Sequence, residues 1–116
     1  MASNPRRLRA ADVPNVPIDD PLVNGYELVD GELVPVMQSF RRHAWLCVEI
    51  TTRLRAFVLE NGLGEVYADV WCRLKLLYDP ERLRSPDVAY FTTSALAASG
   101  SDKMFQVLPD LVIEVL

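Results

Sequence analysis

Two acidic residues of this chain stand beside apolar runs typical of core strands. Asp87 leads directly into the apolar run 88–91, and Glu114 stands inside the apolar run 111–116. Burying an ionised carboxylate in a core strand costs on the order of several kcal/mol unless a cation or hydrogen-bond donors compensate it. Two carboxylates on neighbouring core strands could share one divalent cation. The pattern therefore indicates a metal site built from Asp87 and Glu114.

The alternation of side chains along a strand sharpens this prediction. Asp110 and Glu114 point to one face of the final strand, whereas Leu111 and Ile113 point to the other. One face would pack on a helix and the acidic face would open into a cleft. Carboxylates there suit Mg²⁺, which polarises a phosphate and activates an attacking water. The alternatives stay open, because Pro-Asp also forms turns or caps and a single strand Glu can simply face water at an edge.

The first half of the chain contains an arm, a hairpin and a long helix. Prolines and arginines in residues 1–21 predict an extended arm with one short helical turn at most. Asp30-Gly31 between two alternating runs predicts a β-hairpin over 26–37. A helix is expected over 40–61, with Ser39 as its N-cap and Gly62 as its stop.

The predicted core stripe of this helix and the later elements complete an α+β pattern. Several strands with little between them, preceded by one helix, predict a sheet with the helix packed on it. The stripe consists of Trp45, Val48, Leu54, Phe57 and Val58, widened by Cys47 and Ile50. The later elements are one long or two joined strands over 65–77, a turn at 78–81, a strand at 87–91, a short helix at 93–99, a loop at 100–103 and a buried strand at 110–116.

Composition narrows the class of protein. With 116 residues, half of them hydrophobic, the chain is expected to make one domain or part of one, with enough apolar material for a core. A net charge of −4 argues against DNA binding through a broad basic face, although a bound cation would offset the acidity locally. No apolar run is long enough for a membrane span and no secretory signal is visible, so a cytoplasmic location is expected. Cys47 and Cys72 are expected to be buried free thiols, and zinc is not expected.

A set of short motifs in order resembles one known family. The motifs are YELVDGEL at 26–33, His43 at the start of the long helix, GLGEV at 62–66, SPDVAY at 85–90 and PDLVIEVL at 109–116. Together they resemble the Uma2 family, a branch of the PD-(D/E)XK nuclease superfamily. The resemblance implies a domain over 22–116 with a restriction-endonuclease-like mixed β-sheet, a long helix packed on one face, and the C-terminal part of the fold missing.

The resemblance also implies roles for individual residues. Asp87 matches the aspartate of the superfamily's PD motif and Glu114 matches the acid of its third motif, so both are expected to bind Mg²⁺ or Mn²⁺. A lysine stands two residues after that acid in the superfamily pattern, and this chain has Leu116 there. The family implies a substitute lysine further along, beyond the end of this chain. Lys75 and Lys103 stand in no matching position.

Further candidates and two functions remain open. His43, the only histidine, would cap or pack the helix start, whereas the resemblance favours a catalytic role near the cleft as a phosphate contact or metal-shell residue. Glu27 and Glu32 flank the hairpin turn as solvated acids, and one of them could complete the acidic cluster. The resemblance implies a Mg²⁺-dependent endonuclease acting on DNA. The alternative is a non-catalytic, truncated nuclease fold that acts as a binding or interaction module. A homodimer is open under either function.

Overall fold

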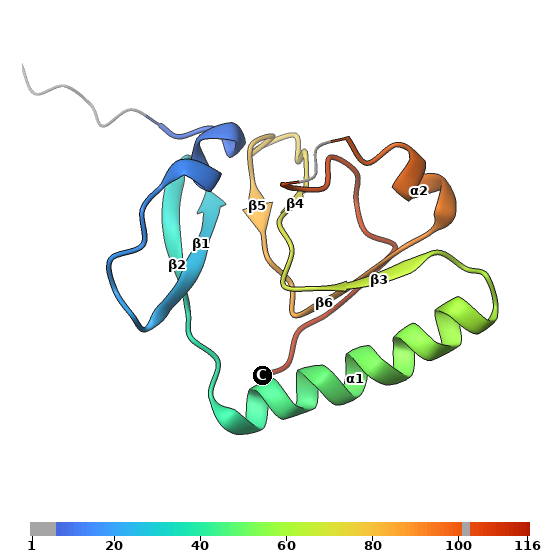
Figure 1. The fold of residues 1–116 in the computed structure, drawn as a ribbon. Coiled ribbons are helices and arrows are strands. Elements are labelled where there is room, and N and C mark those ends of the chain that lie inside the picture. The colour runs from blue at the N-terminus through green and yellow to red at the C-terminus, as the bar shows by residue number, and fades with distance from the viewer. Residues whose placement is uncertain (1–6, 101–102) are drawn as a thin grey trace, which may run out of the picture.

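The computed structural model describes residues 7–100 and 103–116 as an α+β fold with two antiparallel sheets and one long helix (Figure 1). The strand orders are β2-β1-β5-β4 in the four-stranded sheet and β3-β6-β7 in the three-stranded sheet. In chain order the elements are η1 (Ala10–Asn15), β1 (Val23–Val29), β2 (Glu32–Met37), α1 (Arg41–Glu60), β3 (Glu65–Ala68), β4 (Cys72–Arg73), β5 (Leu83–Arg84), β6 (Val88–Phe91), α2 (Thr93–Ala97) and β7 (Leu111–Ile113).

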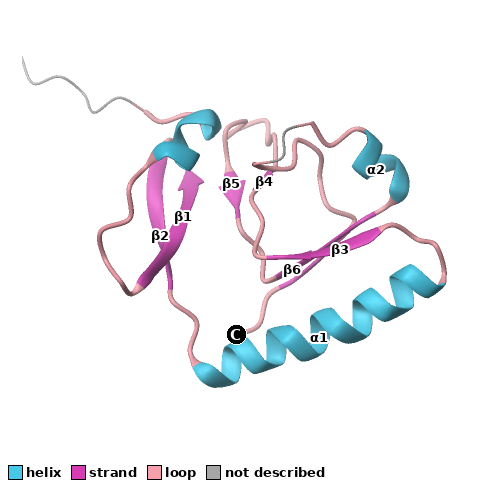
Figure 2. Ribbon diagram, viewed as in Figure 1, coloured by secondary structure: helices cyan, strands magenta, loops and turns pink. Residues whose placement is uncertain are grey.

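The predicted α+β class, with a long helix packed on a sheet, is confirmed. Helix α1 contacts β3 and β6 and runs along the three-stranded sheet, while the β1–β2 hairpin lies beside η1 (Figures 1 and 2). Every pairing between named strands of the described residues is antiparallel. The parallel component is an isolated bridge between Cys72 and Phe105. The expected single sheet is thus divided in two.

The hairpin predicted at Asp30-Gly31 is confirmed. Strands β1 and β2 pair through to Val29 and Glu32, which leaves a two-residue turn. Asp30 has a φ of 51° and Gly31 a φ of 78°. Both values lie in the left-handed region that this tight turn requires and that Asp and Gly tolerate best.

The N-terminal arm takes part in the core. Its one short helical turn is η1, which buries Ala10 and Val13. Both pack in a cluster with Leu28 of β1 and Leu83 of β5. The prediction of an extended arm missed this packing, and the first six residues of the arm lie outside the described residues.

The segment 65–77 forms two strands in different sheets. β3 ends at Ala68 and joins the three-stranded sheet, whereas β4 begins at Cys72 and joins the four-stranded sheet. Between them Asp69 has a φ of 58°, which breaks the extended backbone and redirects the chain. This break brings Asp69 to the junction of the two sheets.

Helix α1 differs from its prediction in the start and in the packed face. Phe40 occupies the N-cap position and makes no side-chain cap bond, so Ser39 as N-cap is wrong, while Gly62, with a φ of 61°, follows the helix end as predicted. The predicted core stripe is right in part, because Val58 is buried and Cys47 and Leu54 are half-buried, as is Ile50. Trp45 and Val48 are wrong, since they are 61% and 64% exposed, and Phe57 is exposed too. The side turned to the sheet carries His43, Cys47, Leu54 and Val58, which repeat close to helical spacing.

The final strand is shorter and more exposed than predicted. β7 pairs with β6 alone among the described strands, so it forms an edge. Leu111 and Val112 are almost half exposed, which corrects the expectation of a buried strand. The predicted short helix is α2, and half of the predicted loop 100–103 lies outside the described residues. Within the described part of the chain, no helix has the length and apolar character needed to cross a membrane.

Candidate metal centre

Asp87 immediately precedes β6 and follows the buried Pro86. Its Oδ2 accepts a hydrogen bond of 2.7 Å from the backbone N–H of Val115. The same oxygen lies 3.3 Å from Nε2 of His43 on α1. Because Val115 follows Glu114 and β7 pairs with β6, this bond fixes the end of the chain beside Asp87. The structure thus brings together Asp87, Glu114 and His43, the three site residues named from the sequence.

Glu114 experiences an unfavourable environment for its negative charge. Its pKa is raised, first by partial burial and then by the charges of Asp87 and Glu27. A hydrogen bond between the carboxyl groups of Asp87 and Glu114 acts in the same direction. The Arg84 guanidinium opposes the shift without cancelling it. The surroundings of Glu114 therefore disfavour its ionised form relative to a free carboxyl group.

Of the two hairpin acids, Glu27 belongs to this cluster and Glu32 does not. The half-buried Glu27 carboxylate accepts a 2.6 Å hydrogen bond from the Ser85 backbone N–H and pairs with Arg84 Nε at 3.6 Å. Glu32 is exposed beside the turn. The antiparallel contact of β1 with β5 carries Glu27 to the segment that precedes Asp87.

Asp69 is a fourth acid near the site, and the sequence interpretation missed it. Its carboxylate accepts hydrogen bonds from Ser85 Oγ at 3.1 Å and Asn24 Nδ2 at 2.9 Å. The alternating pattern of 65–77 made Asp69 look like an outward-facing strand residue. The usable signal was its residue type, because Asp is disfavoured in strands and tolerates a positive φ.

Cys47 faces the same acids from α1. Its Sγ lies 3.7 Å from Nδ1 of His43, one helical turn earlier. The pKa of the Cys47 thiol is raised by burial and by the negative charges of Asp87, Asp69 and Glu114. Both predicted free thiols are found, Cys72 buried and Cys47 half-buried. The cluster thus joins hard oxygen ligands to an imidazole and a thiol.

The fold of this chain is shared with a solved structure. A solved structure, described as a putative nuclease of DUF820 from Anabaena variabilis, has a TM-score of 0.73 and 16% sequence identity to this chain. The match covers 94% of this chain and 58% of that chain, so this chain spans little more than half of the nuclease it resembles. At this identity the likeness shows a shared fold.

The family follows from the sequence match. The family model Uma2, described as "Putative restriction endonuclease", matches residues 20–116, and the chain belongs to this family. A comparison with curated proteins found no match. The family match confirms the resemblance seen in the ordered motifs.

Proposed function

We propose that this chain carries the metal-binding half of a Mg²⁺-dependent DNA endonuclease, with Asp87 and Glu114 as metal ligands. One observation carries the proposal. Two carboxyl groups from adjacent strands lie side by side, and their mutual repulsion helps to raise the pKa of Glu114. Proteins rarely keep such an arrangement without a ligand that uses it. Membership of the Uma2 family supports the nuclease class.

The donor set fits a hard divalent cation. Mg²⁺ prefers carboxylate and water oxygens, and Mn²⁺ accepts the same ligands. The Val115 N–H and His43 Nε2 both engage Oδ2 of Asp87, so Oδ1 takes part in neither contact. A cation placed between Asp87 and Glu114 would remove the repulsion between their charges.

Each residue then has a defined task in phosphodiester hydrolysis. Bound Mg²⁺ supplies positive charge that polarises the scissile phosphate and lowers the pKa of an attacking water. The Val115 N–H and the His43 imidazole hold the Asp87 carboxylate in one orientation. The Ser85 N–H holds Glu27 near Glu114, which adds to the field that attracts the cation.

A second candidate function is a non-catalytic module that binds nucleic acid or a partner. The observation that favours it is Leu116, which stands two residues after Glu114 where the superfamily pattern has lysine. A lysine at that position would stabilise negative charge developing on the phosphate. Without an equivalent lysine the acidic cluster would still bind metal, and cleavage would be slow or absent.

The test is the nicking of supercoiled plasmid by the purified chain in Mg²⁺ or Mn²⁺. Nicking should require the metal, and Asp87→Asn should lower it by about 10³-fold, because removing the ligand removes several kcal/mol of transition-state stabilisation. Glu32→Gln, which alters an acid of the same hairpin outside the cluster, is the matched control. Equal nicking by Asp87→Asn, or nicking in EDTA, contradicts the proposal. Metal-dependent DNA binding without cleavage supports the second candidate.

A further inference from the structure

We propose that His43, Cys47 and Asp87 form a zinc-binding site that shares Asp87 with the proposed magnesium site. The three residues offer one ligand atom each, and these atoms all lie within 4.8 Å of one another. All three side chains are half-buried, so they are held in place and remain reachable by an ion. The set combines nitrogen, sulfur and oxygen donors, the three ligand types that Zn²⁺ binds in proteins.

The helix supplies two of the ligands on one face. His43 and Cys47 are four residues apart on α1, so their side chains lie one above the other. Both lie on the side of the helix that faces the three-stranded sheet, where β6 presents Asp87. The sequence-based prediction that the chain has no Cys/His ligand spacing overlooked the His-x-x-x-Cys spacing of these two residues.

The distances suit a tetrahedral ion after a small contraction. Bond lengths of about 2.0–2.3 Å place tetrahedral ligand atoms roughly 3.4–3.7 Å apart. Asp87 Oδ2 lies 3.3 Å from His43 Nε2, and Cys47 Sγ lies 3.7 Å from His43 Nδ1. The Asp87 contact uses Nε2 of His43, whereas the Cys47 contact uses Nδ1. An ion bound to one ring nitrogen must therefore draw the ligand that contacts the other nitrogen inward by about 1 Å. Three protein ligands and one water complete the coordination.

The thiol decides which ion the site selects. Mg²⁺ binds oxygen ligands and makes no use of sulfur, whereas a thiolate favours zinc. On binding, the Cys47 thiol releases its proton to solvent and the sulfur electron pair forms the bond to Zn²⁺. Since Asp87 serves both sites, zinc excludes magnesium. If the proposed nuclease function holds, Zn²⁺ should therefore inhibit Mg²⁺-dependent nicking, and this consequence rests on that function.

Cobalt(II) reports the site directly, because a thiolate bound to Co²⁺ gives a near-ultraviolet charge-transfer band. Titration of the wild-type chain with Co²⁺ should produce this band, and Zn²⁺ should remove it by displacement. Cys47→Ser should abolish the band and weaken zinc binding by about 100-fold in competition with a chromophoric chelator. Cys72→Ala, which removes the other free cysteine, should keep the band. Circular dichroism confirms that each variant is folded.

Each outcome decides between the proposals. Absence of the band in the wild-type chain, its persistence in Cys47→Ser, or its loss in folded Cys72→Ala overturns the zinc site. If Cys47→Ser does not fold, His43→Gln must lose the band for the proposal to stand. Nicking with Mg²⁺ in a chain that gives no cobalt band rejects the zinc site alone. A cobalt band in a chain that never nicks DNA rejects the nuclease alone.

Discussion

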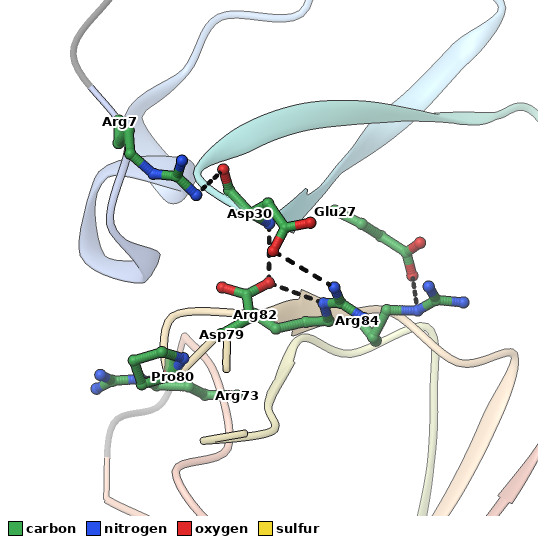
Figure 3. A network of polar contacts seen from close by, with 8 residues as sticks. All are labelled: Arg7, Glu27, Asp30, Arg73, Asp79, Pro80, Arg82 and Arg84. Atoms are coloured by element: carbon green, nitrogen blue, oxygen red, sulfur yellow. Dashed lines mark hydrogen bonds and ion pairs between the residues drawn. The ribbon is translucent and has the colours of Figure 1, made fainter. Parts of the chain in front are cut away.

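Two carboxylates of this molecule, Asp79 and Asp87, have opposite surroundings. Asp79 is only 5% exposed, accepts a 2.8 Å hydrogen bond from the Asp30 backbone N–H and pairs with Arg82 Nε at 2.9 Å (Figure 3). Asp87 is half-buried and lies beside another acid, Glu114. The first charge is compensated by a cation of the protein. The second lies in a cluster of acids, where its charge helps to raise the pKa of Glu114.

The compensated acid serves the fold. Through Asp30 and Arg82, Asp79 ties the tip of the hairpin to the segment that enters β5, and Arg7 binds the Asp30 carbonyl from the N-terminal arm (Figure 3). Leu28 of β1 and Leu83 of β5 pair with each other and are fully buried. A buried acid with all its partners inside the protein is therefore evidence for structure. A partly buried acid among acids is evidence for function.

Substitution of Asp79 should produce the largest loss of stability. Asp79→Ala leaves the Arg82 guanidinium and the Asp30 N–H without their shared acceptor in a buried place. Loss of one member of a buried ion pair costs about 3 kcal/mol or more in the free energy of unfolding. Urea unfolding followed by circular dichroism measures this cost as a shift of the midpoint at an unchanged slope.

Asp87→Ala is the matched comparison for that loss. It removes the hydrogen bond from Val115 and the contact with His43, and it also relieves the repulsion with Glu114, so the losses and the gain oppose each other. A change within about 1 kcal/mol is expected in the absence of metal. Equal destabilisation by the two substitutions would show that Asp87 is structural like Asp79 and would remove the contrast between the clusters.

The two cysteines also differ in their surroundings, and the expected effects on stability are smaller than for the two acids. Burial alone raises the pKa of Cys72 to about 11, whereas the acids of the cluster contribute to the raised pKa of Cys47. An unfolded thiol ionises near pH 9.0, so the folded state binds more protons above that pH. Stability is then lost as the pH rises toward 11, by on the order of 1–2 kcal/mol.

Cys72→Ala should flatten this alkaline loss, measured as the free energy of urea unfolding between pH 8 and pH 10.5. The relevant quantity is the slope with pH, because the substitution also removes packing against Ala89 and Phe91 at every pH. Cys47→Ala should change the slope less in buffers whose ionic strength screens the carboxylates. The same slope in Cys72→Ala and wild type would contradict the assignment of burial as the cause.

Local patterns in the sequence predicted the elements well, and predicted their packing poorly. The hairpin was predictable because its turn depends only on Asp30 and Gly31, two residues that tolerate a positive φ. The apolar residues of α1 point in several directions, and the sequence alone does not say which face meets a sheet. The predicted stripe joined Trp45 and Val48, which are exposed, to residues such as Val58 that do pack on the sheet.

The candidate site was predictable in part for the same reason. Asp87 and Glu114 interrupt apolar strands, which marks them locally, and the resemblance placed His43 beside them. Asp69 and Glu27 join the cluster only because β3, β1 and β5 converge there, through a backbone break at Asp69 and a strand pairing distant in sequence. Pairings over such separations leave no local signal.

Glu114→Gln should give the smallest change in the free energy of unfolding. The change should be a gain, whereas substitution of Asp79 should give a loss. Because the pKa of Glu114 is raised in the folded state, the folded chain binds more protons than the unfolded chain above pH 4.5. The wild-type chain therefore loses stability as the pH rises through this window, and a glutamine does not. Thermal unfolding should show a gain of about 0.5 kcal/mol or less for Glu114→Gln at pH 7 and no gain at pH 4.

Added Mg²⁺ should make the wild-type chain the more stable of the two at pH 7. A ligand that binds only the folded state stabilises it, and it should stabilise the wild-type chain more than Glu114→Gln, which lacks one carboxylate ligand. The gain of the variant should therefore shrink or change sign as Mg²⁺ is added, measured by the same unfolding transitions. A gain that persists unchanged at saturating Mg²⁺ would mean that Glu114 does not bind the ion. Asp87 and Glu114 would then not share a metal.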